Sequence, residues 1–168
     1  MKYEISLTAT DVAIHLVKLA ARDRIPLDPM KIQKLLYYVQ CWHLSEKNSP
    51  LFPERFKAWI WGPVVPSVWH EVSGNESDLK PDLELNQEQA NHVESVWMAL
   101  RELSSTELSS MTHEPGMAWK KARADTPEWM PSSNPLNLDD MRLEVEKRLS
   151  DGQKWVSENL DDLRRECA

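Results

Sequence analysis

The chain has 168 residues, 41% of them hydrophobic and 28% charged, values typical of one soluble globular domain that can bury a substantial core. No apolar run approaches the roughly 18 residues of a membrane-spanning helix, and residues 1–10 lack the apolar segment of a secretion signal, so we expect a cytoplasmic protein without a membrane partner. Residues 1–75 carry nine Lys or Arg and seven Asp or Glu, whereas residues 76–168 carry eleven and twenty. The acidic second half argues against nucleic-acid binding there, and it suits either a solvated surface or a basic protein partner.

Two helices are predicted in the first part of the chain. Thr8 and Asp11 have the spacing of a helix cap, and the apolar positions that follow indicate a first helix ending near Ala21. Asp28-Pro29 is a strong start signal for a second helix, because aspartate caps and proline suits the first helical position. Apolar and aromatic residues cover most of the circumference of this second helix, so we expect the 28–44 helix at the centre of the fold.

A rigid aromatic corner is predicted next. Side chains alternate over Phe56–Trp61 with apolar or aromatic groups on both faces, which indicates a short strand covered on both sides. A glycine and two prolines predict a stiff, extended elbow over Gly62–Val65. Pro66 is placed to begin a short helix over Ser67–Ser73, which Gly74 would close.

Three tryptophans, Trp59, Trp61 and Trp69, belong to this corner. One interpretation is that the corner is simply buried core, as aromatic residues often are. The other is that it presents part of a protein-binding surface, since tryptophan is enriched at binding hot spots. The two interpretations are compatible, because a corner can bury one face and expose the other.

The remaining sequence is predicted to be helical on both sides of a loop. Asn86 can cap a long helix, Ser105 or Thr106 can restart a short one, and Met117–Arg123 indicates one or two further turns. Three prolines exclude regular helix over residues 125–135.

The last segment is helical again, with Asn137 as a possible cap. Ser150 and Gln153 have the spacing of a capping box, which would start a separate helix. The alternative is one continuous helix through Gly152, at a cost of about 1 kcal/mol for the glycine.

No motif of catalytic or metal chemistry is present. Four scattered glycines exclude a glycine-rich phosphate loop, and the sequence contains no nucleophile elbow, zinc-binding histidine pair or Cys-x-x-Cys motif. The cysteines stand in no metal-binding spacing, which predicts reduced thiols. We therefore expect no enzyme activity, no cofactor and no metal site. The alternative is an enzyme or nucleic-acid-binding regulator whose site is assembled from residues distant in sequence, namely His43, His70, His113 and Arg123.

Six segments in register resemble one known family over roughly residues 8–125. They are residues 31–38 (KIQKLLYY), 40–44 (QCWHL), 50–52 with 56–59 (PLF and FKAW), 61–66 (WGPVVP), 108–114 (LSSMTHE) and 118–123 (AWKKAR). Together these segments are similar to the Panacea-domain family, the SocA-like antitoxins that are also known as phage-associated GepA-type proteins.

The resemblance implies an antitoxin of a bacterial or prophage toxin–antitoxin system, which neutralises a toxin encoded beside it by direct contact. In one branch of the family the antitoxin is an adaptor that hands its toxin to a cytoplasmic AAA+ protease. Some members carry an additional DNA-binding segment, but residues 1–10 and 126–168 show no helix-turn-helix pattern and the tail is acidic. We therefore do not expect nucleic acid as a partner.

The expected architecture is mainly α, a compact multi-helix Panacea (SocA-like) domain over residues 1–125 with a small β-hairpin-like element. Residues 126–168 form carboxy-terminal helices packed on or adjoining that domain. The expected contacts with the cognate toxin lie in the aromatic corner, the family-like segments and the acidic tail. They are Trp59, Trp61, Gly62, Pro63, Val64, Pro66, Trp69, His70, His113, Trp119, Asp161 and Asp162.

Overall fold

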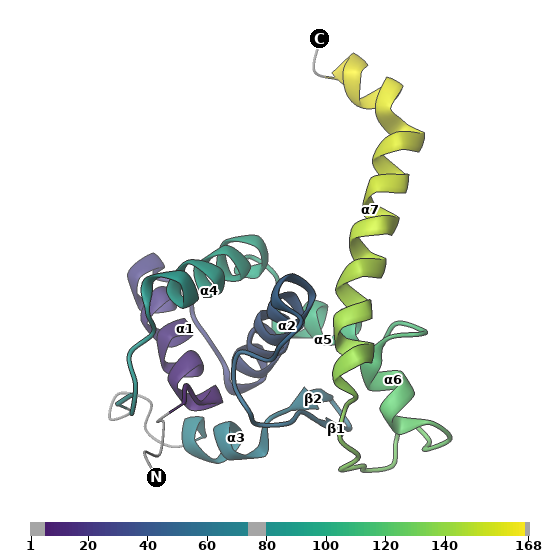
Figure 1. Cartoon of the computed structure of the whole chain (residues 1–168). Helices are drawn as coiled ribbons and strands as arrows, with labels where there is room; N and C mark the ends of the chain where they lie inside the picture. Colours follow the sequence, from purple (N-terminus) through teal and green to yellow (C-terminus); the bar gives the residue numbers. More distant parts are fainter. Residues whose placement is uncertain (1–5, 74–79, 167–168) are drawn as a thin grey trace.

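Helices packed around one central helix make up most of the chain (Figure 1). The computed structural model describes residues 6–73 and 80–166, and after Gly152 it describes the backbone alone. In chain order the elements are α1 (Ala9–Asp23), α2 (Pro29–Lys47), β1 (Lys57–Trp59), β2 (Gly62–Val64), α3 (Pro66–Val72), α4 (Gln87–Leu100), α5 (Ser105–Thr112), α6 (Ala118–Arg123) and α7 (Leu138–Glu166). The predicted fold class, mainly α with a small β-hairpin, is confirmed. None of the described helices is long and apolar enough to cross a membrane.

Local capping sets the start of the first two helices, as predicted. The Thr8 hydroxyl accepts a hydrogen bond from the Asp11 N–H at 3.2 Å, and the Asp11 carboxylate accepts one from the Thr8 N–H at 3.0 Å. The other Asp11 oxygen accepts the N–H groups of Asp82 and Leu83 at 2.8 and 3.3 Å, so this buried carboxylate also fixes the segment before α4. Asp28 caps α2, with proline at its first helical position.

Helix α2 lies at the centre of the fold, with α1, α4, α5, α7 and the hairpin packed against it. Leu35 and Leu36 are completely buried, and so are the polar residues Gln33 and Lys34. A helix that is covered on nearly every side must bury some polar groups, and these require hydrogen-bond partners within the protein. The central position predicted for the 28–44 helix is confirmed.

The β element is a two-stranded antiparallel hairpin in which Ala58 pairs with Pro63. The strand expected over Phe56–Trp61 is shorter, since it ends at Trp59, and the segment expected as a stiff, extended elbow from Gly62 onward forms the second strand. The chain can reverse here because Gly62 has a φ of 115°, a left-handed conformation that side-chain-bearing residues rarely adopt. The elbow is therefore extended, as expected, but it pairs with the preceding strand.

A third segment pairs with the free edge of β1. The Ala58 N–H donates to the carbonyl of Asn134 at 2.8 Å, and the Leu136 N–H donates to the carbonyl of Phe56 at 2.9 Å. The end of the proline-rich loop, predicted to lack helix, thus runs beside the hairpin without forming a longer strand.

Helix α7 begins inside the common core. Met141 and Val145 are buried with the residues of α2, and the Tyr37 hydroxyl of α2 donates to the buried carboxylate of Glu144. The Arg148 guanidinium donates to the carbonyl of Met111 at 2.7 Å, which ties α7 to α5. The described beginning of the carboxy-terminal extension therefore shares its core with the helices before it, and the boundary at residue 125 stays a prediction.

The backbone of α7 is continuous from Leu138 to Glu166. Of the two alternatives for this segment, the continuous helix is therefore confirmed and the separate helix beginning at Ser150 is wrong. Gly152 is exposed, with no atom within 4 Å of the position its Cβ would occupy, and its cost of about 1 kcal/mol does not break the helix. The last turns of α7 extend past the other helices (Figure 1).

Candidate partner-binding site

Side chains of α2 hold the hairpin from one side. The Lys34 side-chain nitrogen donates to the carbonyl of Pro63 at 3.0 Å, and the Gln33 amide oxygen accepts the Val65 N–H at 2.9 Å. A Cβ at Gly62 would lie 2.6 Å from Cε of Lys34, so the hairpin approaches α2 more closely than a residue other than glycine at position 62 would permit. Burial lowers the pKa of Lys34 to about 7.

Side chains of α6 hold the hairpin from the other side. Trp119 is 1% exposed, and its indole N–H donates to the carbonyl of Trp59 at 2.8 Å. The His113 ring stacks on the Trp119 ring at a centroid distance of 3.8 Å, and the Arg123 guanidinium lies over the same ring at 4.9 Å. Arg123 also donates to the carbonyl of Ala58 at 2.9 Å, so the backbone of β1 is fixed at two successive residues.

An open cleft of about 390 Å³ lies between the hairpin turn and the loop after α6. We call it the hairpin cleft, and it is lined by Ile60, Trp61, His113, Trp119, Glu128 and Trp129. Trp61 is 66% exposed and Trp129 is 72% exposed, which is unusual for tryptophan. Arg123 donates to the carbonyl of Pro127 at 2.8 Å and so holds the loop that carries Trp129. Two solvent-exposed indoles therefore flank a cleft whose walls are anchored to the core.

The predicted contact residues differ widely in exposure. Trp61 and His70 are exposed; Trp59, Pro66, Trp69 and His113 are half-buried; Gly62, Pro63, Val64 and Trp119 are buried. Trp59 and Trp69 pack edge to face with ring centroids 6.2 Å apart. Asp161 and Asp162 belong to the backbone of α7, but their side chains lie outside the described residues. Of these residues, Trp61, His113 and Trp119 line the hairpin cleft, and Trp61 is the exposed one among the three.

Sequence reasoning missed the second wall of the hairpin cleft. Glu128 and Trp129 lie in the proline-rich loop, for which the sequence predicts only the absence of regular helix. One signal in the sequence could have indicated this wall, namely a tryptophan between Pro127 and Pro131. Prolines stiffen a loop, and an indole in an exposed, stiff loop is typical of a binding surface.

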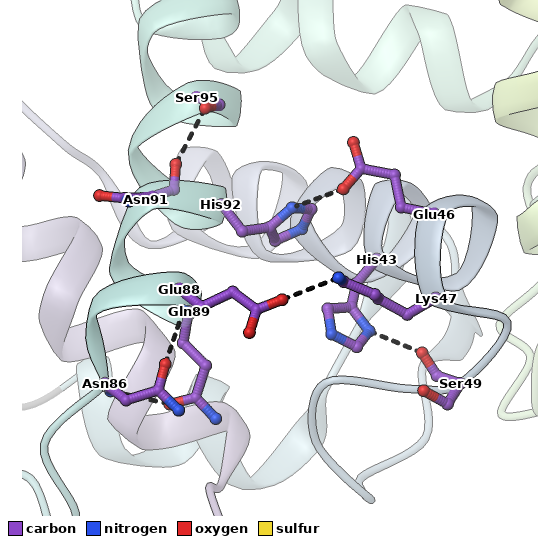
Figure 2. A pocket seen from close by; sticks show the side chains of 10 residues that line it. All are labelled: His43, Glu46, Lys47, Ser49, Asn86, Glu88, Gln89, Asn91, His92 and Ser95. Carbon is purple, nitrogen blue, oxygen red and sulfur yellow. Dashed lines mark hydrogen bonds and ion pairs between the residues drawn. The ribbon is translucent and has the colours of Figure 1, made fainter.

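The histidines of the alternative hypothesis are not brought together. His43 lines a separate, polar pocket of about 550 Å³ between α2 and α4 (Figure 2), where its ring lies 5.4 Å from that of His92. His113 stacks on Trp119 in the hairpin cleft, and His70 is exposed on α3.

In the α2–α4 pocket both imidazoles are fixed by backbone carbonyls. The ring N–H of His43 donates to Ser49 at 2.6 Å and that of His92 donates to Val39 at 2.9 Å, while the carboxylate of Glu46 lies 3.6 Å from Nδ1 of His92. Burial lowers the pKa of His43. Within the described residues, no three His, Cys, Asp or Glu side chains are placed to hold a metal ion.

Comparison with known proteins bears on the same region. The family described as "Antitoxin SocA-like, Panacea domain" matches residues 32–120, more than half of the chain. The chain belongs to this family. Its resemblance to the SocA-like antitoxins, recognised from the sequence, is thereby confirmed. Over 130 residues the chain is also 29% identical to Antitoxin SocA of Caulobacter vibrioides (strain NA1000 / CB15N), covering 68% of this chain and 69% of that protein. No solved structure matches the chain.

The family match covers the scaffold of the hairpin cleft and stops short of one wall. Lys34, Gly62, His113 and Trp119 lie inside the matched residues, so the central helix, the hairpin and the indole beneath the cleft belong to the Panacea domain. Trp129 and all of α7 lie beyond residue 120. The hairpin cleft is therefore built partly from the family domain and partly from the sequence that follows it.

Proposed function

We propose that this protein is an antitoxin that binds a protein toxin directly, and that the hairpin cleft is its main contact surface. The single observation that carries the proposal is the pair of exposed indoles, Trp61 and Trp129, on either side of a cleft inside a SocA-like domain. Indoles supply a large contact area and are the residues most enriched at binding hot spots. Family membership and a relative named Antitoxin SocA support the toxin as the partner.

The anchoring of the hairpin supports tight binding. Lys34, Gln33, Trp119 and Arg123 all hydrogen-bond to the backbone of residues 58–65, so the hairpin needs no ordering when a partner arrives. A surface that is already ordered loses little conformational entropy on association, and more of the contact energy remains as affinity.

The hairpin has no free edge to offer a partner strand. The Asn134–Leu136 segment occupies the edge of β1. The Lys34 nitrogen bonds to the carbonyl of Pro63 on the other side, and the Ser109 hydroxyl donates to the carbonyl of Trp61 at 2.9 Å. Strand addition needs unpaired backbone groups along one edge. The toxin is therefore expected to dock through its side chains in the hairpin cleft.

The acidic end of α7 is proposed as a second contact that steers a basic toxin. Asp161 and Asp162 belong to the last turns of α7. Charges at the rim of an interface mainly raise the association rate. We further propose that the protein acts in the cytoplasm and has no catalytic activity of its own. It either blocks its toxin by remaining bound to it or, as an adaptor, delivers the bound toxin to an AAA+ protease.

The test is co-expression with the protein encoded by the neighbouring gene, followed by pull-down and a binding titration. Trp61→Ala and Trp129→Ala should each weaken binding by roughly 2 kcal/mol or more, since truncating a hot-spot residue costs about that much. Met98→Ala is the matched control, because Met98 is 51% exposed on α4 and lines no part of the hairpin cleft. Equal affinity for all three variants and the parent chain would overturn the proposed surface. Measuring the lifetime of the toxin with and without the antitoxin separates delivery to a protease from simple occupancy.

A further inference from the structure

One charged pair lies at the rim of the hairpin cleft. Glu128 is the only carboxylate among the six lining residues, and its side chain is 72% exposed. Its partner is Lys120 of α6, whose side chain is 36% exposed. Surface ion pairs of this kind contribute little to stability, because both groups are well solvated when they are apart. Glu128 can therefore exchange Lys120 for a cation from outside at small cost.

Another cation near the hairpin cleft, Arg123, is already bound to groups of the protein itself. Arg123 lies beneath the surface, 2% exposed, and donates to the carbonyls of Ala58 and Pro127 while its guanidinium lies over Trp119. Burial lowers the pKa of His113, the lining imidazole, so that ring is uncharged at neutral pH and does not repel a cation.

The uncharged part of the lining favours a cation that is also flat. The exposed rings of Trp61 and Trp129 stand at the rim with Glu128. An indole face attracts cations through its quadrupole, and tryptophan is the best of the aromatic residues for this. A guanidinium is planar, so it stacks flat on aromatic faces and bonds both oxygens of a carboxylate through two parallel N–H groups, whereas an ammonium is a compact point charge without this geometry.

We propose that the hairpin cleft binds an arginine side chain of the protein partner, which replaces Lys120 at Glu128 and stacks on Trp61 or Trp129. The identity of that partner as the toxin rests on the function proposed above, but the chemistry of the hairpin cleft does not. The net charge of −7 for the whole chain supports a partner with basic residues at the surface.

The test uses a small probe, so it requires no toxin. The full chain is titrated with N-acetyl-arginine methylamide, and the indole N–H signals of all eight tryptophans are followed by NMR. The matched control is N-acetyl-citrulline methylamide, which has nearly the same shape and no charge. The arginine probe should shift the signals of Trp61 and Trp129 and bind at least about threefold more tightly than the citrulline probe. Equal binding of the two probes, or no shift at these two signals, would overturn the proposal.

Three charge variants sharpen the test. Glu128→Gln should weaken arginine binding about threefold to tenfold, because it removes the charged acceptor. Lys120→Gln should strengthen binding, since it removes the competing cation. Lys121→Gln removes the same charge one residue away, where the lysine pairs with Asp140 at 3.3 Å, and should leave binding unchanged. If both lysine variants strengthened binding equally, the effect would come from the overall electrostatic potential of the protein, and the exchange of Lys120 for arginine at Glu128 would be refuted.

The outcomes separate this inference from the proposed function. In one outcome, Trp61→Ala loses toxin binding but the arginine probe binds no better than the citrulline probe. This result would retain the hairpin cleft as the toxin surface and reject the arginine site. In the other outcome, the arginine probe binds as expected but toxin affinity is unchanged in Trp61→Ala and Trp129→Ala. This result would retain the arginine site and reject the hairpin cleft as the toxin surface.

Discussion

Alanine substitutions at three glycines test how closely the hairpin approaches α2, because the three sites differ in backbone conformation and in crowding. Gly62 combines a left-handed backbone, with φ of 115°, and a crowded site, because its Cβ would lie 2.6 Å from Cε of Lys34 and 3.1 Å from the Thr112 hydroxyl. Gly116 has φ of 80° but only Nζ of Lys147, at 3.6 Å, near its Cβ position. Gly152 is helical with nothing near it.

The expected free energies of unfolding follow from these environments. Gly116→Ala should cost about 1–2 kcal/mol, the price of a left-handed backbone for alanine. Gly62→Ala should cost about 2–5 kcal/mol, because it adds the displacement of Lys34 from the carbonyl of Pro63, and an unsatisfied buried acceptor costs about 1–3 kcal/mol. Gly152→Ala should stabilise the protein by about 0.5–1 kcal/mol, since alanine is the better helix former.

Urea unfolding followed by circular dichroism measures all three free energies on one scale. A loss for Gly62→Ala no larger than that for Gly116→Ala would show that the hairpin does not need its contact with Lys34. The double variant Gly62→Ala with Lys34→Ala provides a direct check, because residues in contact couple by about 0.5–3 kcal/mol. If the two losses simply add, the reasoning about crowding is refuted.

Three further predictions concern the core, the buried lysine and the tail. Leu35→Ala should lower the free energy of unfolding by about 2–5 kcal/mol, because the Leu35 side chain in the central helix is completely buried. A loss below about 1 kcal/mol in urea unfolding would contradict the central position of α2. Lys34 has a pKa of about 7 in the folded protein, against an ordinary value of 10.5, so above pH 7 the unfolded chain binds more protons than the folded one. The free energy of unfolding should therefore rise with pH by about 1 kcal/mol per pH unit. This rise should hold up to about pH 8.5, where the Cys41 thiol ionises in the unfolded chain. Lys34→Met should remove that slope in urea unfolding at pH 7 and 8.5, and an unchanged slope would assign it to another group. Asp161→Asn with Asp162→Asn should slow association with the toxin and weaken its salt dependence in stopped-flow measurements, while an unchanged rate would exclude steering by the tail.

Helix starts were predictable from the sequence because capping is local. The Thr8 and Asp11 pair, Asp28-Pro29 and Asn86 each bond to backbone groups within three residues, so their spacing contains the whole interaction. The cap of α5 is Ser104, one residue before the predicted restart, and it too is a local capping box. At Ser150 the sequence allowed either a capping box or a continuous helix, and the helix continues because it satisfies the same backbone groups.

Only the tertiary structure decided which tryptophans are exposed. Trp119 is buried against the hairpin and Trp59, a residue of β1, is half-buried, whereas Trp61 and Trp129 face solvent. Alternation along a strand indicates that two faces exist, but the elements that cover each face come from distant parts of the chain. The hairpin cleft arises where α5, α6 and the loop before Asn134 meet the hairpin, and such long-range contacts depend on packing that no local pattern contains.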